Sequence, residues 1–287
     1  MKVWHEGAIV EAGRVAVSIE DRAFEYGLGL FETMRTWNGF ALLLPRHLAR
    51  LRASATELGI DLDGVALPDR LAVLQLVQAV DLGGDVALRL TVSGGAGRDG
   101  GPRPMAWLAA RPLPPPESGT LRIGIVEGAY GRAERSVHGH KSLNYAGRRA
   151  IHEIGSFAGL DDSLLVDAER NVVEASRNSV LLISEDAPDR LITPRLDGAI
   201  LPGVMRSAAI EAAINAGFAV DQRPIPVDEL RRGGILLLSN ALRGIRVVGE
   251  LDGRPLGGPA DLPLVRLLVH DLPARLARQA RSESRES

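Results

Sequence analysis

The chain has 287 residues, 34 basic and 36 acidic side chains, and no cysteine. Its formal net charge of −2 provides no basic surface, so we predict that neither nucleic acid nor a membrane is a partner. The lack of cysteine excludes disulfides, thiolate metal ligands and cysteine nucleophiles, and the lack of an uncharged apolar run of membrane-spanning length predicts a cytoplasmic protein.

The first 111 residues predict a small lobe that mixes helices and strands. Alternating apolar residues indicate strands, and apolar residues at every third or fourth position indicate helices. Asn38-Gly39, between two such strands, is a hairpin turn signal. We expect strands over residues 3–10, 15–19, 30–37, 40–44, 86–92 and 105–110, and helices over residues 45–58 and 68–80.

A proline-rich segment, residues 112–119, marks the clearest boundary in the chain. It is stiff and has no apolar periodicity, so we predict that it links the small lobe to a larger lobe over residues 120–275. The polar C-terminus predicts a disordered tail over residues 276–287. In the larger lobe we expect strands over residues 121–127, 163–167, 180–184, 234–239 and 245–250, and helices after Lys141, after Gly203 and over residues 262–280.

Lysine occurs at two positions, Lys2 and Lys141, in a chain with a large excess of arginine. Most lysines are solvated surface charges. Lys141, however, lies in the run HGHKSLNYAGRR, where partial burial beside other cations would favour the neutral amine that a Schiff base requires. The same run contains His138 and His140, a spacing that is also found in metal sites. No third ligand follows at a recognised spacing, so we predict no metal.

A carboxylate and an anion-binding turn accompany this lysine. Glu174 precedes an apolar strand, where it either faces water or pairs with a pyridinium. The run ILPGVMR opens a helix whose first free amides belong to Val204 and Met205, and such a helix start suits an anion as well as a simple cap. Arg50 is either a surface charge or the phosphate counter-charge. Together these groups predict a pyridoxal phosphate site.

Four runs resemble, in order, the motifs of class IV aminotransferases, which are fold-type IV pyridoxal phosphate enzymes. The runs are DRAFEYGLGLFETMR from Asp21, PRHLARL from Pro45, KSLNY from Lys141 and ILPGVMR from Ile200. The resemblance covers nearly the whole chain and implies a two-lobe α/β (α+β) fold, pyridoxal 5'-phosphate as cofactor and a homodimer. It also implies amino acids and 2-oxo acids as substrates.

The resemblance also implies the roles of individual residues. Lys141 forms the Schiff base with the cofactor and shuttles the proton, and Glu174 pairs with the pyridine nitrogen. Tyr145 approaches the phenolic oxygen. The phosphate is held by Arg50, Val204 and Met205.

Two positions depart from the family. Five residues after the glutamate the family usually carries asparagine, but this chain has Ser179, and Leu181 stands where an aromatic residue is usual. Alternatively, Asn178 has slipped by one residue and serves the same role, which would require a bulge.

The sequence indicates the family more clearly than it indicates the reaction within the family. D-amino-acid transaminases carry Val-Tyr-Glu where this chain has Leu30-Phe31-Glu32, and an Arg-x-His carboxylate trap where it has Arg98-Asp99-Gly100. The run LSNALRGIRVV, which contains Asn240 and Arg243, is similar to the aminodeoxychorismate lyases. We expect Asn240 at the cofactor, and Phe31, Arg98 and Arg243 at the substrate.

We rank an aminotransferase that acts on a D-amino acid or a branched-chain amino acid first. A lyase that releases pyruvate and 4-aminobenzoate ranks second, and a non-catalytic binding scaffold ranks third. The handedness of the substrate is left open.

Overall fold

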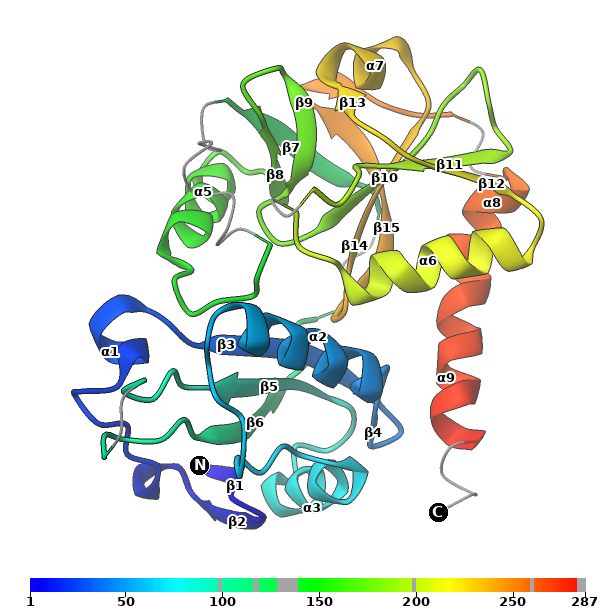
Figure 1. Cartoon of the computed structure of the whole chain (residues 1–287). Helices are drawn as coiled ribbons and strands as arrows, with labels where there is room; N and C mark the ends of the chain where they lie inside the picture. The colour runs from blue at the N-terminus through cyan, green and yellow to red at the C-terminus, as the bar shows by residue number, and fades with distance from the viewer. Residues whose placement is uncertain (98–99, 116–118, 128–138, 198–199, 259–260, 283–287) are drawn as a thin grey trace. The chain divides into compact units, whose positions relative to one another are not determined.

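The computed structural model describes residues 1–287 apart from residues 98–99, 116–118, 128–138, 198–199, 259–260 and 283–287 (Figure 1). The chain divides into two compact units. Unit 1 comprises residues 1–115, 140–145 and 276–287, and unit 2 comprises residues 116–139 and 146–275. Residues 140–145, which include Lys141, therefore belong with the N-terminal part of the chain.

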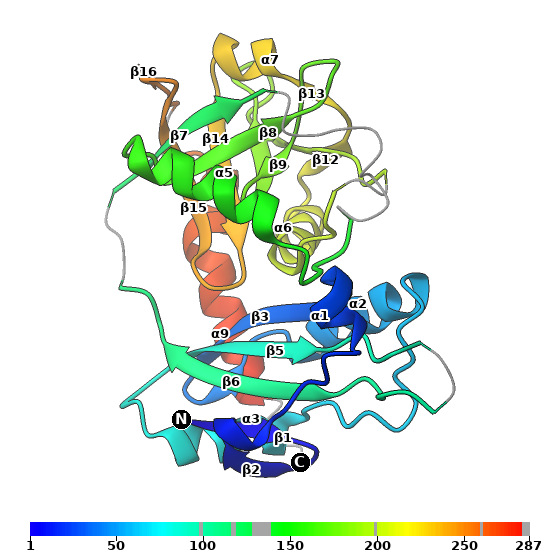
Figure 2. The same cartoon turned by 90° about the vertical axis from the view of Figure 1, so that its left-hand side faces the viewer.

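Unit 1 is built on a six-stranded antiparallel sheet in the order β2-β1-β6-β5-β3-β4. Figure 2 shows β3, β5 and β6 of this sheet side by side. Its strands are β1 (Lys2–His5), β2 (Ala8–Glu11), β3 (Leu30–Trp37), β4 (Phe40–Ala41), β5 (Val86–Val92) and β6 (Ala106–Pro112). Its helices are α1 (Arg22–Tyr26), α2 (Leu44–Glu57) and α3 (Arg70–Val80), with a 3-10 turn η1 (Ala12–Arg14).

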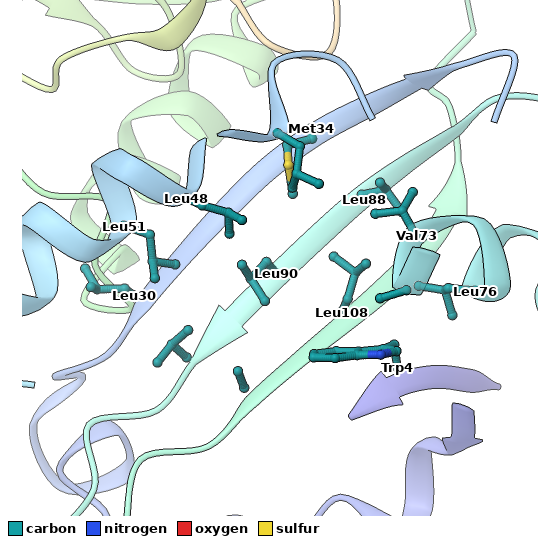
Figure 3. Close-up of a cluster of buried hydrophobic side chains, with 14 of the residues drawn as sticks. Trp4, Leu30, Met34, Leu48, Leu51, Val73, Leu76, Leu88, Leu90 and Leu108 are labelled. Atoms are coloured by element: carbon teal, nitrogen blue, oxygen red, sulfur yellow. The ribbon is translucent and has the colours of Figure 1, made fainter. Parts of the chain in front are cut away.

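The core of unit 1 lies between this sheet and helices α2 and α3 (Figure 3). Successive side chains of a strand point to opposite faces, so Leu30, Glu32 and Met34 of β3 share one face. Leu30 and Met34 belong to the core, and Glu32 is buried on the same side. The strand thus carries a carboxylate into an otherwise apolar layer. The core side chains labelled in Figure 3 are Trp4, Leu30, Met34, Leu48, Leu51, Val73, Leu76, Leu88, Leu90 and Leu108.

Unit 2 is built on a ten-stranded mixed sheet in the order β12-β11-β10-β14-β15-β7-β8-β9-β13, with β16 paired to β15. Its strands are β7 (Leu121–Val126), β8 (Asp162–Val166), β9 (Asn171–Ala175), β10 (Ser179–Ile183), β11 (Arg190–Thr193), β12 (Ala219–Gln222), β13 (Ile225–Pro226), β14 (Ile235–Asn240), β15 (Gly244–Leu251) and β16 (Arg254–Pro255). The helices are α5 (Ala146–Phe157), α6 (Val204–Asn215), α7 (Val227–Arg232), α8 (Pro263–Arg266), the π-turn η3 (Leu267–Asp271) and α9 (Leu272–Ser282), which continues into unit 1.

Four predicted elements differ from the structure. The strand predicted over residues 40–44 is limited to β4, because Leu43 adopts a positive φ angle of 56° and Leu44 begins α2. Residues 3–10 form two strands, because Glu6 and Gly7 adopt positive φ angles of 48° and 84° and close a hairpin between β1 and β2. Residues 15–19 form no strand in the described chain, and the apolar side chain of Ile19 is 75% exposed. The predicted disorder from residue 276 onward is wrong up to Ser282, because Leu276 and Ala280, spaced four residues apart, bury one face of α9.

None of the described helices is long and apolar enough to cross a membrane.

Candidate active site

Lys141 lies beside the first residues of β3. Its carbonyl oxygen accepts a hydrogen bond of 2.8 Å from the amide of Phe31, and the amide of Leu143 donates to the carbonyl of Gly29 at 2.8 Å. The approach is close, since a Cβ atom at Gly29 would lie 2.6 Å from the Leu143 side chain and 2.7 Å from the carbonyl of Val92. The glycine in the run GLGLFE therefore lets the KSLN segment run along the strand.

The Lys141 amine lies against two aromatic rings. Its Nζ is 4.5 Å from the ring centroid of Phe31 and 5.5 Å from that of Tyr145. The two rings meet edge to face with 5.2 Å between their centroids. Both distances from Nζ are within the range of cation–π attraction. The structure thus brings together three residues that the sequence predicted for the site.

Glu32 joins Arg50 and His47 on the α2 side of β3. Nε and Nη2 of Arg50 donate to Oε1 and Oε2 of Glu32 at 2.8 and 2.6 Å, and Nδ1 of His47 lies 2.7 Å from Oε2. Glu32 is 1% exposed. Burial would raise the pKa of Glu32, but the charge of Arg50 and the hydrogen bonds from both partners outweigh burial and lower it to about 2. Glu32 is therefore a permanent anion at neutral pH.

His47 is buried against this carboxylate. Burial lowers the pKa of His47, and the positive charges of Arg50 and Lys141 lower it further, against the opposing effect of Glu32. The ring is therefore neutral at pH 7. Because Nδ1 faces an ionised carboxylate, it carries the ring proton and donates it to Glu32.

Arg89 of β5, which the sequence did not indicate, lies beside a predicted site residue. Its guanidinium lies 3.7 Å from the centroid of Phe31, the ring that Lys141 also contacts. Burial, and then the charge of Arg111, lower the pKa of Arg89. No carboxylate pairs with Arg89 among the residues that the structure describes. A partly buried guanidinium of this kind favours an anionic ligand.

Glu174 lies on β9 in unit 2 and is 3% exposed. It does not face water, and Nη2 of Arg148 donates to its Oε1 at 2.5 Å. Arg148 compensates the charge of Glu174, and Arg149 pairs with Glu153 at the surface.

Helix α6 starts without a side-chain cap. Its N-cap is Gly203, and the first intrahelical bond runs from the amide of Ser207, so the amides of Val204 and Met205 precede that bond. A Cβ atom at Gly203 would overlap Oγ of Ser179.

Opposite Ser179 on β14, Ser239 has a buried hydroxyl that lacks a hydrogen-bond partner within the described chain. Open helix amides, a glycine and an unsatisfied hydroxyl fit a phosphate group.

Asn178 connects two turns of unit 2. Its Nδ2 donates to the buried carboxylate of Asp162, and its Oδ1 accepts from Nδ2 of Asn240 at 2.6 Å. Oδ1 of Asn240 in turn accepts from the amides of Leu242 and Arg243, at 2.9 and 2.8 Å. The strand needs no bulge, because β10 and β14 pair regularly from Ser179 onward. Asn240 thus fixes the turn that carries Arg243.

Two candidate residues, Arg98 and His138, lie outside the described residues. His140 bonds through Nδ1 to Oγ of Ser54 at 3.0 Å. In the chain as described, no three His, Asp or Glu side chains come close enough to hold a metal ion.

Comparison with known proteins identifies the family. The family profile for amino-transferase class IV matches residues 29–251. A bifunctional aminodeoxychorismate lyase / D-amino acid transaminase from Mycobacterium tuberculosis is 31% identical over 89% of this chain and 93% of its own length. A branched-chain-amino-acid aminotransferase from the same species is 29% identical over 80% of this chain and 68% of its own length.

A solved structure supports the same assignment. It is a hypothetical aminotransferase from Mycobacterium tuberculosis with α-ketoglutarate and PMP bound. It is 25% identical, with a TM-score of 0.79 over 96% of this chain and all of that chain. The chain therefore belongs to the class IV aminotransferase family, and the predicted α/β fold with two sheets is confirmed.

Proposed function

We propose that the protein transfers an amino group between an amino acid and a 2-oxo acid with pyridoxal 5'-phosphate as cofactor and Lys141 as the reacting amine. The main observation is the surroundings of Lys141, whose Nζ lies against Phe31 and Tyr145 in the unit that also holds the Glu32–Arg50 pair. Family membership supports the reaction and the cofactor.

When bound, pyridoxal phosphate supplies an electron sink for the charge left on the substrate's α-carbon. Lys141 receives the α-proton at Nζ and returns it. Tyr145 is proposed to hold the phenolic oxygen, and Glu174 to keep the pyridine nitrogen protonated. Arg50 and the amides of Val204 and Met205 are proposed to bind the phosphate, as their fit to an anion supports.

Arg89 is proposed to receive a carboxylate of the substrate. Its guanidinium and the Lys141 amine both contact the ring of Phe31. Phe31 has no hydroxyl that would compete with Arg89 for the carboxylate. Arg98 and Arg243, which the sequence suggested for this task, stay predictions.

The second candidate reaction is aminodeoxychorismate cleavage. It is favoured by the run Asn240-Ala241-Leu242, where Asn240 holds the amide of Leu242, and by the bifunctional relative that carries both activities. Release of pyruvate and 4-aminobenzoate without an amino acceptor would move this candidate to first place. Amine transfer from the D or L enantiomer of alanine and leucine to 2-oxoglutarate would decide the handedness and the substrate type.

We also propose a homodimer. Three large apolar side chains near α1 face solvent, since Ile19, Phe24 and Tyr26 are 75%, 72% and 70% exposed. Monomers rarely expose such side chains together, and a protein partner is the usual reason when they do. A cytoplasmic location stays a prediction from the sequence.

The lysine assignment is tested by Lys141→Ala. Wild-type protein loaded with pyridoxal phosphate should be yellow, and borohydride should fix a pyridoxyl group on Lys141, which peptide mass spectrometry detects. The variant should lose the visible absorption band and all turnover. Lys2→Ala is the matched control, because it removes the only other lysine of the chain and should change neither. A variant at Lys141 that stays yellow and active would refute the proposal.

A further inference from the structure

Glu32 and His47 are buried polar residues to which the proposed function assigns no task. Glu32 is on β3, and His47 and Arg50 are on α2, one turn apart. Glu32 and His47 are each 1% exposed. Burial of charged and polar side chains costs free energy unless they are paired. Here Glu32 is paired with both His47 and Arg50.

The geometry of the Glu32–Arg50 pair fixes the orientation of the Arg50 guanidinium. The carboxylate of Glu32 accepts hydrogen bonds from Nε and Nη2 of Arg50. This bidentate arrangement fixes the plane of the guanidinium. His47 donates from Nδ1 to the same carboxylate and so fixes the rotation of Glu32. An arginine held in this way loses the rotamer freedom that its long side chain would otherwise have.

We propose that Glu32, supported by His47, is a positioning residue that orients the guanidinium of Arg50 for the phosphate of the cofactor. The inference rests on the proposed function, because it takes Arg50 as a phosphate ligand. Because Nε and Nη2 of Arg50 both donate to Glu32, the carboxylate fixes the plane of the guanidinium and with it the directions in which its N–H groups point. Glu32 thus acts through Arg50 and does not touch the phosphate.

A purely structural ion pair would predict a different result. Loss of such a pair would destabilise unit 1. It would then weaken the binding of any ligand near Lys141, whether or not the ligand carries a phosphate. A positioning role affects the phosphate alone. The informative quantity is therefore the ratio of two affinities of the cofactor-free protein, for pyridoxal phosphate and for pyridoxal, which lacks the phosphate.

The experiment titrates cofactor-free wild type, Glu32→Gln and Arg50→Gln with both aldehydes and follows the visible absorption band. Glutamine keeps the size of Glu32 but removes its charge. We expect Glu32→Gln to lower the affinity for pyridoxal phosphate by about tenfold and to leave the affinity for pyridoxal unchanged. The reason is the loss of the charge-assisted pair with the arginine that is proposed to bind the phosphate. In the Arg50→Gln background, Glu32→Gln should not change the ratio further.

His47 offers a second variant series that leaves the ion pair in place. His47→Leu should lower the affinity ratio by about threefold, and His47→Asn, whose amide can donate from nearly the position of Nδ1, should restore it. Glu6→Gln, a change at an exposed carboxylate of the same unit, is the control and should not alter the ratio.

Equal losses for both aldehydes in Glu32→Gln would overturn the positioning role and leave the lysine assignment intact. An additional drop of the ratio in the double variant would also overturn it, since Glu32 would then act independently of Arg50. If neither aldehyde gives a visible band with the wild type, the proposed function itself fails.

Discussion

Glu32 places a carboxylate in an apolar layer, and its ionisation links the stability of unit 1 to pH. The pKa of Glu32 falls from 4.5 to about 2 on folding. A depressed pKa adds stability above the unfolded value, and this stability is lost as the pH falls from 4.5 toward 2. For this buried group the shift corresponds to about 3 kcal/mol.

We therefore predict that Glu32→Gln destabilises the protein at pH 7 and flattens the decline of its stability between pH 4.5 and pH 2. Urea denaturation at a series of pH values measures this difference. Glu6→Gln should keep the wild-type slope, because its side chain is 71% exposed. Parallel curves for wild type and Glu32→Gln would show that the carboxylate is not held as an anion.

A substitution of Arg89 tests its proposed role in binding a substrate carboxylate. If it binds a substrate carboxylate, Arg89→Ala should raise the KM for 2-oxoglutarate by about 10- to 100-fold, since an anion bound to a partly desolvated guanidinium contributes ~1.5–3 kcal/mol. Cofactor affinity should stay unchanged. Arg149→Ala, at a side chain that is 76% exposed, is the control for removal of a positive charge. An unchanged KM would remove Arg89 from the site.

Individual elements show what a single sequence predicts well. The predicted strands over residues 30–37 and 86–92 coincide with β3 and β5, because alternation of apolar residues reports directly on one buried face. Asn38 and Gly39 adopt the positive φ angles of 50° and 82° that their turn signal predicts. Alternation fails over residues 15–19, where the same pattern exposes its apolar side chains and pairs with no described strand.

The turn after β14 depends on hydrogen bonds from a neighbouring turn. Asn178 accepts from Asn240 and donates to Asp162, and the amide of Ala175 donates to its carbonyl at 2.8 Å. Asn178→Ala leaves the two side-chain partners unsatisfied and should lower the free energy of unfolding by ~1–3 kcal/mol.

Urea denaturation measures this effect of Asn178→Ala. Amide hydrogen exchange should also accelerate at Leu242 and Arg243, whose amides Asn240 holds. The control is Asn215→Ala, at an exposed asparagine that ends α6. Unaltered exchange at both amides would show that the turn does not depend on Asn178.

At the scale of the whole molecule, the order of short motifs was sufficient to predict the family and the fold, and the residues named for the candidate site stay predictions. Pairings across the sheets were not predictable. Arg89 is adjacent to Phe31 only because β3 and β5 pair in the register that places Thr33 opposite Arg89. Likewise, Arg148 reaches Glu174 from a helix that a sequence pattern does not orient. A single sequence has no signal for such contacts between distant residues.

The proposed dimer is the last test, and it concerns the surface of the whole molecule. If the apolar side chains near α1 contact a second copy, Phe24→Glu should bury a charge there and convert dimers to monomers at micromolar concentration. Analytical ultracentrifugation measures the change. Leu71→Glu is the control, because this leucine is 60% exposed on α3 of the same unit, outside the surface near α1, and should leave the assembly intact. A wild-type protein that sediments as a monomer, or a Phe24→Glu variant that stays dimeric, would contradict the assignment of this surface.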